Sequence, residues 1–262
     1  LVLDHSFLKS ENAIMVPNTS DGRVLFAVPW HDVVIIGTTD TEVKEISIEP
    51  MATDEEIDFI LSNAEKYMTR KPKRSDVKSL FTGLRPLISK ENTSSKSLSR
   101  KHTIYQSKKG VFHLLGGKWT TYRKMGQDVL DLINSTNRLN VKPSKTKDLK
   151  IFGYKNGVSW NDPLHFYGSE KNLVRSMGSN EPLTPLLPLT TAQIIYAVKF
   201  EMAKTIEDVL SRRTRCLLID AKECIKIAPI VAKIMSSELN AKENWEQEQI
   251  KLFLDLAKNY HL

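Results

Sequence analysis

The residues best suited to chemistry lie where an apolar run meets a helical pattern. The run ends in Gly116 and Gly117, and Lys118, Thr120 and Thr121 open the next helix. Paired glycines allow a close approach to the backbone, and the free N–H groups of a capped helix N-terminus attract negative charge. The segment therefore predicts a corner that presents main-chain donors and an ammonium group to an anionic ligand. An ordinary Gly-Gly turn is the simpler interpretation of Gly-Gly-Lys alone.

Two arginines are candidate contacts for a charged substrate. Arg85 precedes Pro86, which disfavours helical dihedral angles and so keeps Arg85 on extended backbone. A guanidinium group there can stabilise a developing alkoxide or hold a substrate electrostatically. Arg100 lies in a short basic run before a predicted strand, and its planar group suits bidentate phosphate contact. A surface arginine is the alternative for both.

Polar residues near the second predicted strand and two histidines complete the candidates. Thr38 and Thr39 can donate hydrogen bonds into a site, whereas Asp40 suits a turn. His102 and His113 lie near the candidate arginines and lysine, and either can serve as a base, but a packed or exposed histidine is the favoured interpretation. The six histidines show no ligand spacing, so no metal site is predicted.

Three motifs together resemble a known enzyme family. They are Leu114-Leu-Gly-Gly-Lys-Trp-Thr-Thr-Tyr-Arg123, Gly83-Leu-Arg-Pro-Leu87 and Gly37-Thr-Thr-Asp40. They are similar to segments in the carboxy-terminal half of the FAD-dependent, quinone-linked glycerol-3-phosphate dehydrogenases. The resemblance extends along nearly the whole chain and is strongest over residues 17–133. It implies oxidation of sn-glycerol 3-phosphate to dihydroxyacetone phosphate, with hydride passing from C2 to flavin N5 and electrons then passing to a membrane quinone.

The resemblance also implies roles for individual residues. Contacts to the FAD cofactor fall on the corner: Gly116, Gly117, Lys118, Trp119, Thr120 and Thr121. Contacts to the substrate fall on Arg85, Arg100, Lys118 and Thr39, with Arg85 at the carbon that loses hydride and Arg100 at the phosphate. Arg85 and Lys118 are the predicted catalytic residues.

The sequence lacks the usual fingerprint for the rest of the cofactor. A dinucleotide-binding fold is marked by G-x-G-x-x-G, and no two of the eleven glycines here are separated by a single residue. By the resemblance, the adenosine and pyrophosphate of FAD belong to residues outside this chain. Because Leu1 is not a methionine and Val2-Leu3 already reads as a strand, we interpret the chain as a piece of a longer enzyme, inactive alone.

The first half of the chain mixes strand and helix patterns. Residues 24–28 and 33–36 predict a hairpin, and Thr53 with Glu56 predicts a capped helix. Residues 77–87 read as another strand, and residues 103–106 and 111–115 as a second hairpin. A helix is expected from about Thr120.

The remainder of the chain reads as helical, with caps at Thr190 or Thr191 and at Asp220, and with no confident strand. The predicted fold class is therefore α+β. Residues 1–140 form an antiparallel substrate-domain sheet with flanking helices, which the resemblance identifies as the C-terminal part of a glutathione-reductase-like, D-amino-acid-oxidase-type flavoprotein. Residues 145–262 form a small all-helical domain.

The composition favours an acidic partner. A net charge of +7 and a pI near 9.2 suit phosphorylated substrates, anionic lipid or nucleic acid. Nucleic acid is the weakest of these, because no recognition motif appears and the basic residues are dispersed. Cys216 and Cys224 fit neither a disulfide framework nor a metal site. We expect a cytoplasmic protein with at most peripheral contact to the inner face of the membrane, and a homodimer in the complete enzyme.

Two alternatives remain open. A glycerol-3-phosphate oxidase would share the fold and pass electrons to oxygen. A non-catalytic domain would use its helices to dock on a membrane or a subunit, with Arg212-Arg-Thr-Arg215 as the contact. Cations at a helix C-terminus also explain that motif without any partner.

Overall fold

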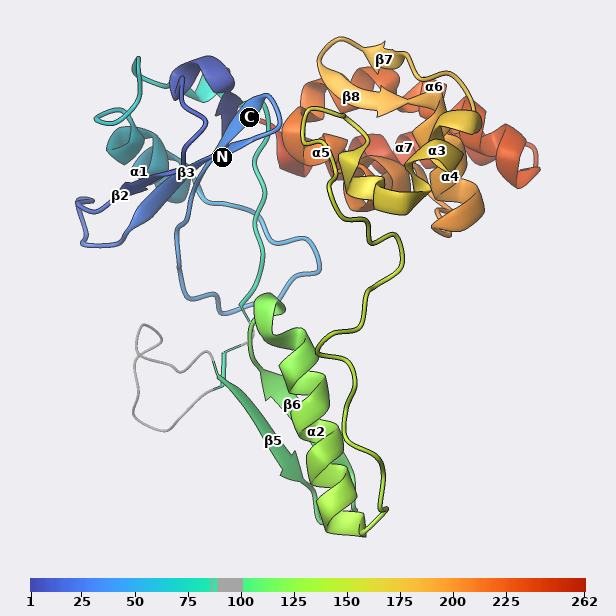
Figure 1. Cartoon of the computed structure of the whole chain (residues 1–262). Coiled ribbons are helices and arrows are strands. Elements are labelled where there is room, and N and C mark those ends of the chain that lie inside the picture. The colour runs from blue at the N-terminus through green and yellow to red at the C-terminus, as the bar shows by residue number, and fades with distance from the viewer. Residues whose placement is uncertain (86, 89–100) are drawn as a thin grey trace. The chain divides into compact units, whose positions relative to one another are not determined.

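The computed structural model describes residues 1–85, 87–88 and 101–262 (Figure 1). Residue contacts divide the chain into two compact units. Unit 1 comprises Leu1–Thr41, Glu45–Gly83 and Lys155–Leu262, and unit 2 comprises Glu42–Lys44 and Leu84–Tyr154. The first sheet and the last helices thus share one unit. The domain boundary at residues 140–145 that composition predicts stays a prediction.

Unit 1 begins with a four-stranded antiparallel sheet of order β1-β4-β3-β2. Its strands are β1 (Val2–Asp4), β2 (Ile14–Val16), β3 (Leu25–Trp30) and β4 (Val33–Gly37). The predicted hairpin is β3–β4, but its loop is shorter than expected because β3 continues through Pro29, which lies opposite Val34. The register between β2 and β3 ends at Ala27, so a residue without an N–H is tolerated at position 29.

Each face of this sheet meets a different core. Val34 and Ile36 of β4 pack with the apolar side of α1 (Asp54–Ala64), whereas Val33 packs with the buried residues of the C-terminal helices. This alternation is the period of two expected for a strand covered on both faces. The predicted capping box of α1 is confirmed, because the Thr53 hydroxyl accepts from Glu56 N–H and the Glu56 carboxylate accepts from Thr53 N–H.

Residues 77–80 connect the sheet to the helices. They were predicted to belong to a strand but form only one bridge, Val2 with Ser79. Lys78 N–H donates to the Val2 carbonyl, and the Lys78 carbonyl accepts from Ala221 N–H. Ser79 Oγ donates to the Leu217 carbonyl at 2.9 Å. Leu80 N–H also donates to the Tyr260 carbonyl at 3.0 Å. The hydrogen bonds of the segment thus go to three different neighbours, and so it does not extend into a regular strand.

The C-terminal part of unit 1 is mainly helical. Its helices are α3 (Lys171–Ser176), α4 (Thr191–Phe200), α5 (Cys216–Ile219), α6 (Ala221–Leu239) and α7 (Trp245–Ala257), with a 3-10 turn η5 (His165–Glu170) and a π-helical turn η6 (Asp208–Arg213). Thr190 caps α4 and Asp220 caps α6, as predicted.

One feature corrects the expectation of an all-helical C-terminal domain. Strands β7 (Pro182–Thr184) and β8 (Leu187–Thr190) form a short hairpin before α4. The sequence does not predict this hairpin because it contains Pro182, Pro185 and Pro188. Proline cannot donate a hydrogen bond to a neighbouring strand and is accepted only at strand ends and edges.

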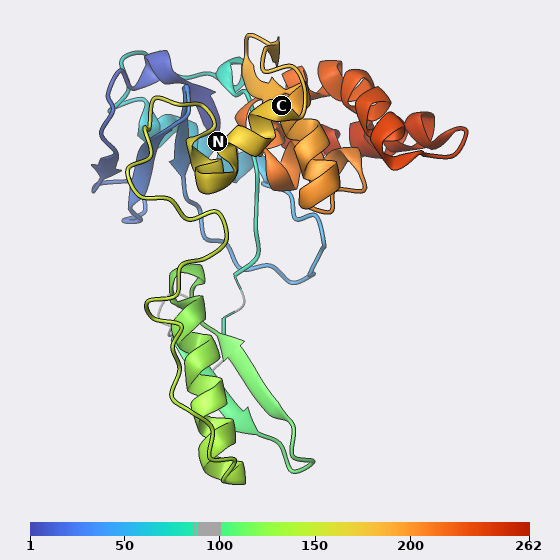
Figure 2. The ribbon, with the colours of Figure 1, turned by 45° about the vertical axis from the view of Figure 1, so that its right-hand side comes forward.

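Unit 2 consists of a hairpin and a helix. Strands β5 (His102–Gln106) and β6 (Phe112–Gly116) pair in antiparallel fashion, which confirms the second predicted hairpin. A 3-10 turn, η4 (Trp119–Thr121), leads into α2 (Tyr122–Asn137). Both views of the ribbon show α2 lying along the hairpin (Figures 1 and 2).

We predict that Asp220→Ala lowers the free energy of unfolding of unit 1 by about 2–3 kcal/mol. The buried Asp220 carboxylate accepts from Glu223 N–H at 3.0 Å and pairs with Lys78 Nζ at 2.7 Å. The substitution removes the helix cap and leaves a partly buried lysine without its counter-ion. Denaturant unfolding followed by circular dichroism measures the change. Asp255→Ala breaks a solvent-exposed pair with Lys258 and should change stability by less than about 0.5 kcal/mol.

Candidate active site

The glycine corner has a backbone that only glycine adopts readily. Gly116 has φ +70° and Gly117 has φ +91°. A Cβ at Gly116 would lie 2.9 Å from Ile88 Cδ1 and 3.1 Å from the Lys101 carbonyl oxygen, and one at Gly117 would overlap the Met125 thioether. Both the dihedral angles and the packing against β5 and α2 therefore require glycine at these two positions. Because glycine has no side chain, neighbouring residues pack directly against the backbone.

The residues after the glycines form a tight, exposed turn. Lys118 N–H donates to Thr121 Oγ1 at 3.4 Å, and the Thr121 hydroxyl donates to the Lys118 carbonyl at 3.0 Å. Thr121 therefore closes η4 and makes no side-chain cap on α2, unlike the cap that the sequence predicts. Lys118, Trp119 and Thr120 are all exposed. The Trp119 ring is 86 % exposed and stacks on Tyr122 with 5.7 Å between centroids.

A histidine–aspartate pair lies beside the corner. His102 pairs with Gly116 in the hairpin register, and its Nε2 lies 3.0 Å from Asp128 Oδ2 of α2. The hydrogen bond from Lys124 is the first cause that lowers the pKa of Asp128, and His102 adds to the effect. The sequence did not indicate Asp128, because the two partners are 26 residues apart. Its i,i+4 relation to Lys124 is the only local signal.

The structure gathers only part of the predicted site. The six corner residues are contiguous in unit 2, and Arg85 belongs to the same unit with an exposed side chain. Arg100 lies outside the described residues, although its neighbour Lys101 approaches Gly116. Thr39 belongs to unit 1. His113 stacks face to face on Tyr105, with 4.7 Å between centroids.

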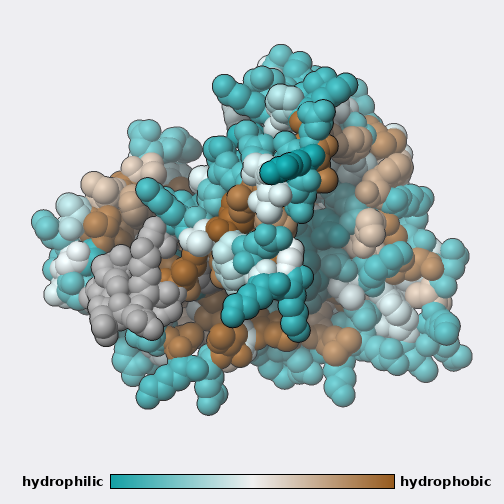
Figure 3. All heavy atoms as spheres, turned by 90° about the horizontal axis from the view of Figure 1, so that it is seen from below, coloured by the Kyte–Doolittle hydropathy of each residue, from teal (hydrophilic) through white to brown (hydrophobic). Residues whose placement is uncertain are grey.

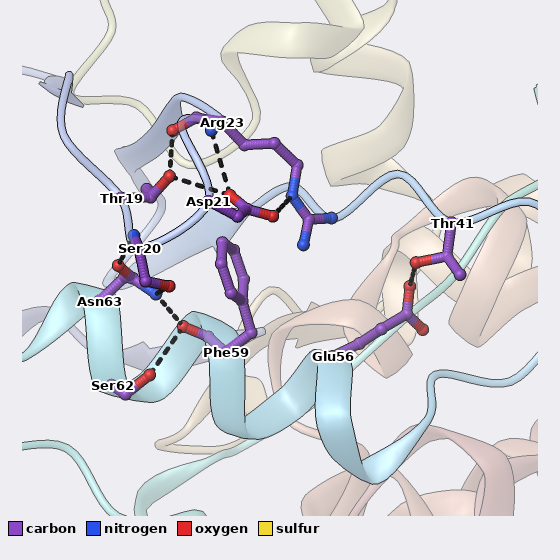
Figure 4. A network of polar contacts seen from close by, with 9 residues as sticks. All are labelled: Thr19, Ser20, Asp21, Arg23, Thr41, Glu56, Phe59, Ser62 and Asn63. Carbon is purple, nitrogen blue, oxygen red and sulfur yellow. Dashed lines mark hydrogen bonds and ion pairs between the residues drawn. The ribbon is translucent and has the colours of Figure 1, made fainter. Parts of the chain in front are cut away.

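Thr39 belongs to a polar network around α1, part of which Figure 4 shows. The Thr41 hydroxyl donates to Glu56 at 2.7 Å. Burial would raise the pKa of Glu56, but hydrogen bonds from Thr41, Thr53 N–H and Thr39 outweigh it and hold that pKa below its usual range. Thr39 therefore helps to fix the loop after β4 against α1, which is a structural role that the sequence did not predict.

Unit 2 has little interior. None of its described residues is buried, and large apolar side chains such as Leu115, Trp119, Tyr122 and Leu130 are more than a third exposed. Apolar side chains, brown in Figure 3, also reach the surface on the face drawn there. A two-stranded hairpin is marginal in water unless further strands or a helix pack on it, and here the packing of α2 leaves none of the described residues buried. The corner thus lies on a surface that a ligand or more polypeptide can cover.

Among the described residues, no group of three or more His, Cys, Asp and Glu side chains could hold a metal ion. Within the same ranges, no helix is long and apolar enough to cross a membrane.

Comparison with known proteins identifies the class. Residues 112–250, more than half of the chain, match the family model described as the C-terminal domain of alpha-glycerophosphate oxidase. The chain belongs to this family, as the motifs around the glycine corner predict.

Its relatives are longer proteins. The mitochondrial glycerol-3-phosphate dehydrogenase of Saccharomyces cerevisiae is 28 % identical over 97 % of this chain and 48 % of its own length. The human mitochondrial enzyme is 29 % identical over 96 % of this chain and 38 % of its own length. The crystal structure of glycerol-3-phosphate dehydrogenase from Bacillus halodurans in complex with FAD is 26 % identical, with a TM-score of 0.80, over 99 % of this chain and 55 % of that one. This likeness confirms the predicted fold class.

We predict that Gly117→Ala speeds amide hydrogen exchange across β5, β6 and the start of α2. The positive φ of Gly117 costs an alanine about 1–2 kcal/mol, and the new methyl group must displace Met125. Gly126→Ala is the matched control, since a Cβ there meets nothing within 4 Å and lies in α2, where alanine is favoured by up to about 1 kcal/mol. Equal exchange in the two variants would contradict the role given to the corner.

Proposed function

We propose that the chain is the C-terminal part of an FAD-dependent glycerol-3-phosphate dehydrogenase, which oxidises sn-glycerol 3-phosphate to dihydroxyacetone phosphate. The observation that carries the proposal is the corner itself: two half-buried, positive-φ glycines followed by an exposed lysine turn. The family and the FAD-bound relative support the same assignment.

The corner suits one edge of a flavin. A Cβ at either glycine would collide with Ile88 or Met125, which pack on that side, but both glycines are only half-buried, so a planar ring could approach the main chain from the side that stays exposed. The backbone at Gly116, Gly117 and Lys118 and the side chains of Trp119, Thr120 and Thr121 would hold it. The Lys118 ammonium group, exposed at the turn, would favour negative charge on the ring. When bound, FAD supplies the two-electron acceptor for hydride.

The cationic side chains would position the substrate. Arg85 would stabilise negative charge that develops on the C2 oxygen, and Lys118 would contact the substrate from the flavin side. Arg100 would hold the phosphate, for which a guanidinium group offers paired donors. Thr39, in unit 1, stays a predicted substrate contact. His102, whose ring is held by Asp128 at 3.0 Å, is a candidate to receive the hydroxyl proton, because an oriented histidine can act as a general base.

The remaining parts of the enzyme would come from elsewhere. The chain spans about half or less of the relatives it matches, and its sequence lacks the glycine fingerprint of a dinucleotide-binding fold. Residues outside this chain would bind the adenosine and pyrophosphate. The complete enzyme would be a homodimer in the cytoplasm that contacts the inner face of the membrane peripherally and passes electrons to a quinone.

An oxidase that uses oxygen is the second candidate, since the family model carries that activity in its description. Stopped-flow reoxidation of the complete reduced enzyme with oxygen or with a quinone analogue separates the two acceptors. The docking-domain alternative is weaker, because Arg212 pairs with Glu207 and Asp208, and Arg213 donates to the Glu201 carbonyl. Two of the three arginines in that motif are thus already engaged within the chain.

We predict that the 262-residue chain folds but binds FAD weakly and turns over no substrate, because it supplies only the flavin-edge contacts. Isothermal titration of the chain with FAD measures the affinity. A submicromolar dissociation constant would show that the cofactor contacts are already complete in this chain.

For the complete enzyme we predict that Arg85→Ala lowers kcat/KM by about 10²-fold or more, because the developing charge loses its stabilising guanidinium group. Lys108→Ala, at the tip of the β5–β6 hairpin, is a control for loss of one positive charge. Steady-state kinetics with glycerol 3-phosphate measure both variants. Normal kinetics for Arg85→Ala would remove Arg85 from the site.

A further inference from the structure

A small basic cavity lies in the helical part of unit 1 and has no role in the proposed oxidation. It has a volume of about 140 Å³ and is lined by Lys155, Gly157, Val158, Ser159, His165, Gly168 and Lys171. A water molecule occupies about 30 Å³ of liquid, so the cavity holds the equivalent of four to five waters. Sites for drug-sized ligands are larger, about 300–1,000 Å³. The space therefore suits a small ion or a single polar group.

The carboxylate of Asp162 forms ion pairs with two cations next to the cavity. Asp162 pairs with Lys171 Nζ at 2.7 Å and with Arg175 Nη2 at 2.9 Å, and it also accepts from Leu164 N–H at 3.0 Å. The hydrogen bond from Lys171 is the main cause that lowers the pKa of Asp162 to about 2. One negative charge thus orients two positive charges, and the group keeps an excess of positive charge.

Two further groups face this excess from the cavity wall. Lys155 is exposed and has no hydrogen-bond or ion-pair partner among the described residues. His165 Nδ1 lies 2.8 Å from the Asp162 carbonyl oxygen, which can only accept. Nδ1 therefore carries the proton, and Nε2 remains for a ligand or a second proton.

Neighbouring residues extend the positive region. His31, in the turn between β3 and β4, has its pKa lowered first by burial and then by the charges of His165 and Arg215. Asp32 opposes this effect. Arg215 is exposed in a left-handed conformation at the start of α5. Arg215 therefore adds a positive charge near His31 and His165.

We propose that this cavity binds a phosphate group, with Lys155 and Lys171 as its cationic contacts and His165 on its wall. A phosphate group fits within the space, and its oxygens accept charge-assisted hydrogen bonds from ammonium groups. The cavity belongs to unit 1, whereas the flavin-edge corner belongs to unit 2.

The test is titration of the 262-residue chain with inorganic phosphate, against chloride at the same ionic strength, by calorimetry and by the ring NMR signals of His165. We expect saturable binding that shifts the His165 signals. Lys155→Glu should weaken the binding by about tenfold or more, since one charge-assisted contact is lost. Lys155 has no partner, so its replacement leaves the Asp162 ion pairs intact. The control Lys233→Gln/Lys251→Gln, on α6 and α7, removes two exposed charges elsewhere and should bind as the unchanged chain does.

Two more ligands identify the source of the phosphate group. Glycerol 2-phosphate represents a soluble monoester, and phosphatidylcholine vesicles containing phosphatidic acid represent a lipid headgroup. Lys155→Glu should weaken binding of whichever ligand is held. Absence of saturable phosphate binding, or binding that Lys155→Glu leaves unchanged, would overturn the proposal. Either result leaves the oxidoreductase proposal standing, because no step of this test involves FAD.

Discussion

Unit 1 depends on the hydrogen bonds of residues 77–80, which tie its sheet to its helices. One side of this segment bonds to β1 through Val2, and the other bonds to Leu217 and Ala221 next to the start of α6. The Lys78–Asp220 ion pair adds a side-chain link at the same place. Because β4 also places alternate residues into both cores, the helices cannot shift without disturbing the sheet. The loop that carries Thr39 follows directly from that sheet.

Unit 2 is organised around a different constraint, the backbone of two glycines. Its hairpin and helix meet where Gly117 leaves room for Met125, and where His102 of β5 reaches Asp128 of α2. Few apolar contacts support this arrangement, since none of the described residues of the unit is buried. A flavin at the corner would cover apolar surface such as Trp119 and supply contacts that the hairpin lacks. Cofactor binding and local stability are therefore expected to rise together.

The sequence predicts those features that depend on neighbouring residues. The capping box at Thr53, the cap at Thr190 or Thr191 and the cap at Asp220 are short-range signals, and the structure confirms all three, the second at Thr190. The paired strands of both predicted hairpins are also confirmed. The features that were missed depend on distant partners or on prolines. The β7–β8 hairpin contains three prolines, residues 77–80 bond to three separate neighbours, and Asp128 meets His102 only after folding. The site is predicted only in part for the same reason. The corner can be predicted because its residues are contiguous in the sequence, whereas the sequence does not show whether separate arginines converge on it.

The net charge of +7 does not show by itself where an anion can bind, because some of the cations are ion-paired within the chain and others are not. Arg74 is engaged by Asp54 and Asp58, and Arg212 by Glu207 and Asp208, so these charges are neutralised within the chain. Lys118 and Lys155 are different. Lys118 is exposed next to the two glycines, and Lys155 is exposed on the wall of the cavity. Asp162 sharpens the contrast: a carboxylate shared by two cations fixes their positions without cancelling their charge. Fixed positive charge costs less reorganisation when an anion binds than mobile surface lysines do. The arrangement of the cations, more than their number, thus makes two separate places in this chain suited to negatively charged ligands.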